Sequence, residues 1–426
     1  MAVVTVVKTI GSTGDFSTPQ LWEEASAVDL VTSEQSPAGT FVGTFTQGEN
    51  LTFSISGVTG KFLHSDHATF ITYGITNFGN PATSDVVTGV TSGATCILSS
   101  GVATFTGVIW QGQCQNQEFA GAGTQLTIDT AAITSTVAYV HLTTAPGASF
   151  RDNATVRTNA LRYNTANGCG IRTTGTDLPA IFVFSGFTVI ENLQCAGTGT
   201  GGSGIRYFGA GTTNPPSPRA IDFCILEGTY TGTSTSIGVL GSAVSSGEFS
   251  VRNCVIVQRA SGADHIIGVD RSAPSFYNCT IAAVDDLATA PTNIFRSHAS
   301  SAETITVQNC GLFAGNSTKT IKVGSAAFNF TTCYSDISGT AGVTQTTYSS
   351  EFENVNDATR DFRLKLGAAQ IDSGTTDTTN AAIDISQTLR PQGAVYDVGA
   401  WEFMQTAPAA PGDDDGDVFL ITQAAA

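Results

Sequence analysis

The sequence predicts an all-β fold, and three observations support this prediction. Only 12% of the 426 residues are charged and 46 are glycine, a composition that suits short strands and tight turns more than long helices. An Asn-Cys pair recurs between apolar residues in SVRNCVIVQ (250–258), SFYNCTIAAV (275–284) and TVQNCGLFAG (306–315). Other stretches, such as VGTFTQGENLTF, alternate apolar and polar residues and turn at glycine. We therefore expect a repetitive β architecture.

The first segment, residues 1–36, is expected to cap this fold. In GDFSTPQLWEEAS, Thr18 is placed to be the N-cap of a short helix and Pro19 to occupy its first position. Leu21 and Trp22 would lie on one side of that helix. We expect this side to plug the first coil.

Residues 37–144 do not keep a long repeat, and their alternation and glycine turns predict small antiparallel β units. Two runs here, FTQGE at 45–49 and VTGVTSGAT at 87–95, resemble short modules of phage structural and tail-associated proteins. The resemblance implies a virion protein.

Residues 145–365 carry a repeat that the cysteines make visible. Six cysteines recur at intervals of 23 to 31 residues, namely Cys195, Cys224, Cys254, Cys279, Cys310 and Cys333. An apolar residue stands three positions before five of them, and another stands two positions after four of them. Because side chains alternate along a strand, both apolar residues can face one interior only if the chain bends between them.

Asparagine can make that bend, because it tolerates the left-handed backbone conformation. It precedes the cysteine at Asn253, Asn278 and Asn309, whereas Phe223 and Thr332 take its place in two copies. We predict an asparagine ladder beside a stack of cysteines that act as small buried hydrophobic residues. The predicted stack comprises Cys224, Asn253, Cys254, Asn278, Cys279, Asn309, Cys310 and Cys333. The alternative is a metal or redox centre, but the C-x2–4-C spacing of such sites is absent.

A repeat of this length is typical of a right-handed parallel β-helix, a solenoid in which each coil gives about three strands to three parallel sheets. Open sheet ends attract further strands, so we expect a cap at each end. Residues 366–404 are the expected last coil and closure.

The strongest resemblance lies in ATRDFRLKLGAAQIDSGTT (358–376) and AAIDISQTLRPQGAVYDVGAWEF (381–403). These segments resemble the ending of many right-handed parallel β-helix repeat proteins of bacteria and phages. Leu366 and Ala369 stand where that ending has proline. The resemblance implies the fold but no activity, because the family includes polysaccharide lyases, hydrolases, adhesins and virion proteins.

The tail, residues 405–426, runs from a Pro-Ala linker through four aspartates into Val418, Phe419, Leu420 and Ile421. We predict that this apolar run docks as a strand onto a neighbouring copy or another partner. Two alternatives are a tail folded back on its own coils and a Ca²⁺ loop at DDDGD, for which the remaining ligand positions are missing.

Charge and hydropathy exclude several partners. A net charge of −17 without any Lys/Arg run predicts no nucleic-acid partner. The longest apolar segment, PAIFVFSGFTVI, is far below the roughly 20 residues that span a bilayer, so we expect a soluble chain without a membrane partner. The N-terminus has no basic region before a long apolar one, so we expect no secretory signal, and the nine cysteines are expected to be reduced.

Candidates for catalysis are few. Asp264, Asp270 and Asp285 are weak candidates, because adjacent coils could bring two carboxylates together as glycan-cleaving sites do. Ordinary solvated loop acids are the favoured interpretation. His64 and His67 lie three residues apart but lack a third ligand, so neither a metal nor a cofactor is predicted.

These observations favour a non-enzymatic bacteriophage virion protein, such as a capsid decoration protein, fibre or spike, assembled in the host cytoplasm. Packing three solenoids side by side buries their flanks, so we expect a homotrimer in contact with other virion proteins. The alternative is a tailspike that binds or cleaves a host surface glycan, and the second alternative is a secreted β-helix adhesin. Only three Trp and nine Tyr are available to stack on sugars, which favours the first reading.

Overall fold

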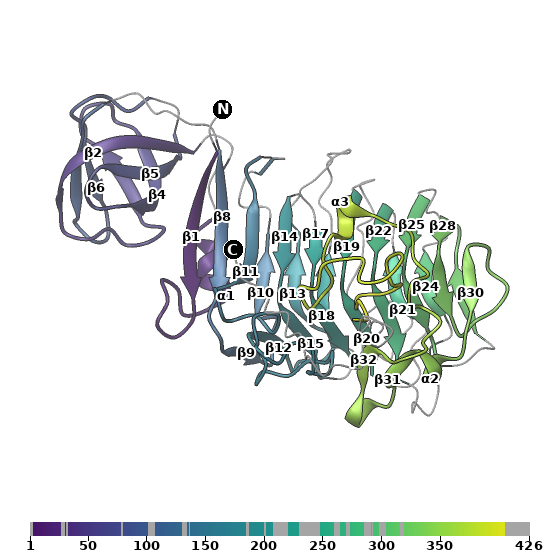
Figure 1. Ribbon diagram of the computed structural model, residues 1–426. Helices are drawn as coiled ribbons and strands as arrows, with labels where there is room; N and C mark the ends of the chain where they lie inside the picture. Colours follow the sequence, from purple (N-terminus) through teal and green to yellow (C-terminus); the bar gives the residue numbers. More distant parts are fainter. Residues whose placement is uncertain are drawn as a thin grey trace, which may run out of the picture.

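The protein is mostly β, with long parallel sheets in one elongated body and a barrel beside its first strands (Figure 1). This architecture comes from a computed structural model. It describes residues 3–26, 30, 33–77, 80–100, 107–129, 134–135, 137–184, 187–199, 202–207, 220–229, 248–259, 265–269, 273–284, 291, 293–297, 304–315 and 319–404. The prediction of an all-β fold is confirmed.

Two nine-stranded sheets and two three-stranded sheets form the body. The β1–β28 sheet contains β1 (Val4–Ile10), β8 (Val108–Cys114), β11 (Val140–Thr144), β14 (Thr188–Glu191), β17 (Ala220–Asp222), β19 (Glu248–Arg252), β22 (Ala273–Tyr277), β25 (Thr304–Gln308) and β28 (Ala327–Thr331). The β9–β30 sheet contains β9 (Glu118–Gly121), β12 (Gly170–Thr173), β15 (Gln194–Gly197), β18 (Ile225–Gly228), β20 (Val255–Gln258), β23 (Thr280–Ala283), β26 (Gly311–Phe313), β29 (Cys333–Ser335) and β30 (Val343–Gln345). The small sheets contain β10 (Leu126–Ile128), β13 (Pro179–Val183) and β16 (Ser203–Tyr207), and β21 (His265–Val269), β24 (Asn293–Ser297) and β27 (Thr320–Val323).

Strands of the two large sheets alternate along the chain, as in β14 then β15, β19 then β20, and β22 then β23. We call one such passage a coil. Each strand pairs in parallel with the equivalent strand of the next coil, as β19 does with β22 and β20 with β23. The order and direction of the strands are compatible with a parallel β-helix.

The interior of the coils is one apolar cluster, to which both sides of each bend contribute. Val251 and Ile256 flank Cys254 and are buried in this cluster, as are Phe276 and Ile281 around Cys279. Residues at offsets of −3 and +2 thus face the same interior, which requires a bend between the two strands.

Helix α1 (Pro19–Glu24) begins at Thr18, whose side chain accepts a hydrogen bond from the N–H of Leu21. Trp22 is fully buried, and its carbonyl accepts a hydrogen bond from Nε1 of Trp110 at 3.1 Å. Leu21 differs from expectation, because it is 47% exposed while its neighbour Trp22 faces the interior. Gly112 makes room for that indole, since a Cβ there would lie 2.5 Å from the Trp22 ring.

The interval 37–144 contains two kinds of structure. A closed antiparallel barrel is formed by β2 (Glu34–Val42), β3 (Asn50–Phe53), β4 (Thr59–Ser65), β5 (Phe70–Ile75), β6 (Val86–Gly89) and β7 (Thr95–Leu98). From β8 to β30 the strands pair in parallel, and β8 itself pairs with β1 and β11. Parallel pairing thus begins well before residue 145, because β1 supplies the first strand of the large sheet and the barrel is inserted after it.

The chain after β30 turns back along the flank of the coils (Figure 1). It forms α2 (Tyr348–Glu351), β31 (Phe352–Asn354), a 3₁₀ turn (Asp357–Thr359), β32 (Asp361–Leu364) and α3 (Thr378–Ala381). We call residues 370–403 the strap. It contacts Thr332 in the bend after β28 and then Asn309, Asn253 and Arg151, so it runs back from the last coil over the earlier ones. Among the described residues, no helix combines the length and apolarity needed to cross a bilayer.

Candidate functional site

Six coils each have one left-handed residue where a strand of the β1–β28 sheet passes into the β9–β30 sheet. These residues, the bend column, are Asn192 (φ 65°), Phe223 (53°), Asn253 (51°), Asn278 (51°), Asn309 (52°) and Thr332 (51°). Backbone hydrogen bonds connect the column from coil to coil, since the N–H of Asn253 donates to the carbonyl of Tyr277 at 3.0 Å. Three residue types therefore make the same turn, with asparagine at four of the six positions.

The asparagine side chains connect coils to each other and to the strap. Asn309 Nδ2 donates to Asn278 Oδ1 at 3.3 Å, which is one rung of the predicted ladder. Asn253 Nδ2 donates instead to the carbonyl of Asn380 in the strap, at 3.2 Å. Asn253, Asn278 and Asn309 are all completely buried.

The cysteines lie directly inside the bend column. Cys224, Cys254, Cys279, Cys310 and Cys333 are unpaired thiols with no exposed surface. The N–H of Cys224 lies 3.4 Å from Sγ of Cys254, so consecutive coils touch at these positions. Burial raises the pKa of Cys333 to about 12 and raises that of Cys254 as well. Burial would raise the pKa of Cys279 too, but hydrogen bonds from its neighbours Cys254 and Cys310 outweigh it and lower that pKa. Thiols without exposed surface suit packing and not nucleophilic chemistry.

The strap covers the bend column with paired backbone and side-chain contacts. Thr375 donates its N–H to Asn309 Oδ1 at 2.8 Å, and its carbonyl accepts from Asn309 Nδ2 at 2.6 Å. One coil further along, the Thr375 hydroxyl lies 2.8 Å from that of Thr332. The N–H of Gly399 donates to the carbonyl of Asn309 at 2.8 Å. The asparagines thus form the binding surface for the strap.

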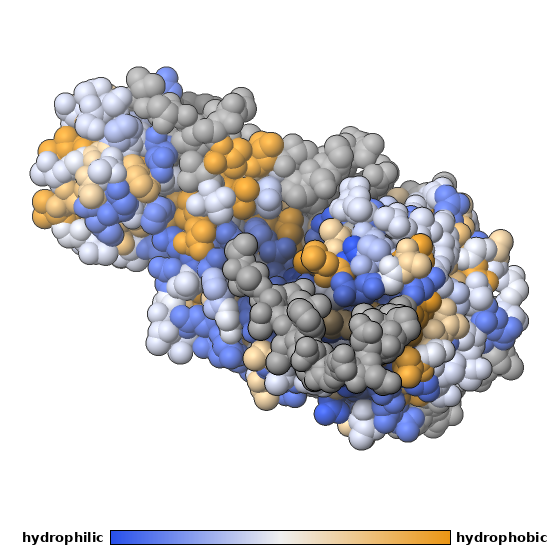
Figure 2. Space-filling view, viewed as in Figure 1, coloured by the Kyte–Doolittle hydropathy of each residue, from blue (hydrophilic) through white to orange (hydrophobic). Residues whose placement is uncertain are grey.

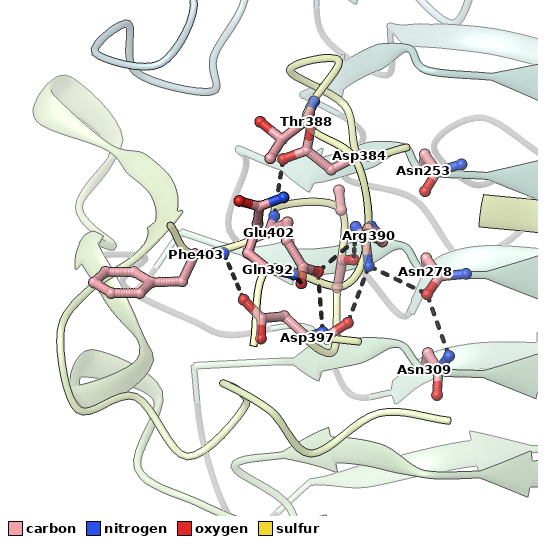
Figure 3. Close-up of polar contacts among 12 residues, drawn as sticks. Asn253, Asn278, Asn309, Asp384, Thr388, Arg390, Gln392, Asp397, Glu402 and Phe403 are labelled. Carbon is pink, nitrogen blue, oxygen red and sulfur yellow. Dashed lines mark hydrogen bonds and ion pairs between the residues drawn. The ribbon is translucent and has the colours of Figure 1, made fainter. Parts of the chain in front are cut away.

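Arg390 lies at the centre of this contact (Figure 3). Its guanidinium donates to Asn278 Oδ1 at 3.3 Å and to the carbonyls of Asp397 at 3.0 Å and Gly399 at 2.8 Å. Glu402 supplies the counter-charge, with Oε2 at 3.7 Å from Arg390 Nε, and neither side chain is exposed. The buried Arg390 therefore connects residues 397–402 of the strap to Asn278 of the coils.

Three carboxylates surround Arg390 or lie beside its partners. Burial and then the neighbouring Glu402 raise the pKa of Asp397 to about 7. Burial also raises the pKa of Glu402, although Arg390 opposes the shift. Asp384 accepts the N–H of Glu402 at 2.9 Å. Two of these three carboxylates thus have a raised pKa in the buried interior of the strap.

Two arginines of the loop after β11 hold the far part of the strap. Arg151 donates to the carbonyls of Ile385 at 2.9 Å and Asp384 at 3.2 Å, and its guanidinium stacks 3.8 Å from the centre of the Phe223 ring. Arg157 pairs with the Asp384 carboxylate at 3.0 Å and lies 3.8 Å from the centre of the Trp401 ring. Sequence reasoning missed both arginines, although RDNATVR places two of only 18 basic residues within one polar loop.

A polar groove of about 280 Å³ lies next to this loop, on the outer face of the β1–β28 sheet. Its lining includes Gln111, Gln113, Asp152, Glu191 and Gln387. Burial would raise the pKa of Glu191, but hydrogen bonds from His141 and Thr143 outweigh it and lower the pKa. The groove therefore presents amides and an ionised carboxylate, groups that can bind hydroxyl-rich ligands.

A row of polar and charged side chains continues from the groove along the same face. The parallel register places Glu191, Asp222, Arg252 and Tyr277 on four consecutive strands. Arg252 Nε donates to Asp222 Oδ1 at 2.6 Å, while burial raises the pKa of Asp222. Sequence reasoning missed this row because the register between coils is not visible without the strand boundaries.

The catalytic and docking candidates from the sequence mostly fall elsewhere. Asp264, Asp270 and Asp285, and the docking run Val418, Phe419, Leu420 and Ile421, lie outside the described residues. His64 and His67 pack against Phe70 and Phe41 respectively, at ring-centre distances of 5.6 and 5.9 Å. Within the described part of the chain, no three His, Cys, Asp or Glu side chains are grouped so as to hold a metal ion.

No protein-family model, curated protein or solved structure matches this chain.

Proposed function

We propose that this protein is a non-enzymatic structural component of a bacteriophage virion, such as a capsid decoration protein, fibre or spike. Its coils would form a right-handed parallel β-helix with α1 as the N-terminal cap. The observation that carries the proposal is the strap, in which buried Arg390 and Arg151 and half-buried Arg157 join one segment to many coils. Arginines that are bonded inside the protein make it more rigid and are not accessible to a ligand, which suits a structural protein. The resemblance of the strap and barrel sequences to β-helix repeat and phage modules supports the same assignment.

The test is to locate the chain in purified particles by mass spectrometry and to place it by imaging. The proposal predicts a fixed copy number per particle and, for a trimer, three copies at each position. Light scattering on the purified protein gives the oligomeric state independently. Absence of the chain from every particle would refute the virion assignment.

The polar groove favours a second candidate, a tailspike that binds or cleaves a host surface glycan. Glu191 and Asp152 supply carboxylates, and Gln111 and Gln113 supply amides that can hydrogen-bond sugar hydroxyls. Incubation with host surface glycan distinguishes the two functions. Release of oligosaccharides that is abolished by Glu191→Gln would favour the tailspike, and an unchanged glycan would favour the structural component.

A further inference from the structure

The last coil of the body ends in unpaired strands. Strands β27, β28 and β30 are each the final strand of their sheet in the described part of the chain. In parallel sheets such edges present free N–H and C=O groups that can accept a further strand. The strap reaches this coil at its bend, where Thr375 contacts Thr332, and its other contacts run back towards Arg151 and away from the open edge of β28.

The apolar interior is also incomplete at this end. In β25, Ile305 and Val307 are fully buried, whereas the equivalent residues of β28, Phe328 and Phe330, are only half-buried. The two rings stack on each other with centres 5.7 Å apart and pack on Phe295. One more layer of apolar side chains would complete their burial.

The charge of this end is opposite to that of the chain as a whole. From residue 304 to residue 350 the charged residues are Lys319, Lys322 and Asp336, in a chain with a net charge of −17. Asp336 is buried and accepts the N–H of Ala314, which leaves the two lysines as the accessible charges of this stretch. Lys322 Nζ lies 5.2 Å from the centre of the Phe328 ring, so cation and apolar surface are contiguous. This surface fits an acidic strand with apolar side chains.

The chain itself contains one such segment. GDDDGDVFLIT, residues 412–422, places four aspartates directly before Val418, Phe419, Leu420 and Ile421. Its aspartates complement the two lysines, and its apolar run has the composition of a strand that could cover Phe328 and Phe330.

We infer that the last coil is the docking surface for the acidic tail of a second copy of this chain, with residues 418–421 added as a strand beside β28. This inference rests on the proposed assembly role. A second copy is favoured because an unpaired edge at the end of an elongated body is open to another molecule. The chain's own tail begins after Phe403, in a cluster that extends from Phe150 to Phe313 and Tyr348. Residues 405–417 could span about 45 Å when extended, so the chain's own tail is the competing occupant.

The test uses the full chain with a photo-reactive phenylalanine analogue at Phe419 and a mixture of light and heavy isotope-labelled copies. Docking in a second copy predicts cross-links to the last coil that join light to heavy chains. Cross-links confined to one chain would show that the own tail occupies the surface, and cross-links elsewhere would show that the surface is not its site. Either result overturns the inference.

Charge variants of the full chain test the chemistry of the contact. The double variant Lys319→Glu with Lys322→Glu should lower the cross-link yield about tenfold at low salt. In it, the attraction between the two lysines and the aspartates of the tail becomes repulsion. Adding Asp414→Lys and Asp415→Lys should restore it. Lys61→Glu on the barrel is the matched control and should leave the yield unchanged. Because purified protein is used, these results do not depend on whether the chain is found in particles.

Discussion

At the scale of single residues, the bend column shows how one backbone geometry is made by different side chains. Asn, Phe and Thr all adopt φ near 50° there, although only asparagine tolerates this conformation readily. Phe223 is stacked by Arg151, and Thr332 bonds to Thr375, so contacts with the rest of the molecule hold the unfavourable cases. Asn278 needs no such support for its backbone and can use its side chain to bind Arg390.

Substitutions in the bend column should act in opposite directions. Thr332→Asn should raise the free energy of unfolding by about 0.5–1 kcal/mol, because asparagine relieves the left-handed strain. Asn278→Ala should lower it by about 1–3 kcal/mol. Alanine adds strain at this left-handed position, and the buried donors of Arg390 and Asn309 lose their acceptor, Asn278 Oδ1. Urea unfolding measures both. Thr331→Asn, in the extended strand β28, is the control, and stabilisation there would contradict the explanation.

The cysteines should be chemically silent in the folded protein. All nine are buried free thiols, and burial raises the pKa of Cys195, Cys254 and Cys310. A thiol reagent at pH 8 should therefore label them only after denaturation. Rapid labelling of native protein, quantified by mass spectrometry, would show that the coils open or that the stack is incorrectly placed.

At the scale of elements, the sequence predicted what depends on local pattern. The helix beginning at Thr18 and the left-handed asparagines follow from residue type and spacing. The exposure of Leu21 was mispredicted, because six residues do not determine which side of a helix meets the body. The strap could not be placed, since its partners Arg151 and Arg157 lie more than 200 residues earlier. Neither the groove nor the Glu191 row could be found, because both depend on register between coils.

Arg390 should dominate the attachment of the strap. Arg390→Met removes the cation that faces Glu402 and leaves that buried carboxylate without a counter-charge, so the free energy of unfolding should fall by about 3–5 kcal/mol. Hydrogen exchange should then increase in residues 370–403 before the coils are affected. Arg162→Met is a matched control, because the Arg162 side chain donates to the carbonyl of Ala358 at the surface, away from Arg390 and Glu402. Equal effects of the two changes would refute the central role of Arg390.

The same element should make stability depend on pH. The pKa of Asp397 rises from 3.8 to about 7, so its contribution is complete below pH 4 and is lost as the pH rises through 7. Carboxylates with a lowered pKa, such as Glu191, lose their contribution only in more acidic solution. Between pH 4 and 7 Asp397 should therefore lower the free energy of unfolding as the pH rises, by at most about 1.4 kcal/mol per unit for its one proton. Glu23, whose pKa is also raised to about 7, acts in the same direction. Asp397→Asn should reduce this slope and leave the part due to Glu23, whereas Asp66→Asn on the barrel should leave the slope unchanged.

At the scale of the whole molecule, the strap covers one flank of the coils, whereas the edge strands at the two ends, β1 and β28, are left without a further strand in the described part of the chain. Figure 2 shows hydrophobic residues gathered where the barrel meets the body on that face, and the edge strand β1 exposes Val7 at 45%. The other end exposes β28 with its half-buried phenylalanines. A rigid body whose incomplete surfaces lie at its ends is suited to assembly through those ends.

Deletion of residues 405–426 should separate folding from assembly. The truncated chain should keep its circular dichroism spectrum, and its free energy of unfolding should stay within about 0.5 kcal/mol of that of the full chain. The reason is that the strap contacts end at Phe403, before the cut. Its incorporation into particles should fall sharply, since the acidic and apolar residues proposed to bind the next copy are gone. A full-length chain carrying only Phe419→Ser keeps the linker and the aspartates, and it should show the same defect if the apolar strand is what binds. Normal incorporation of both variants would mean that the tail has no part in assembly, whereas loss of folding on truncation would mean that the tail belongs to the body itself.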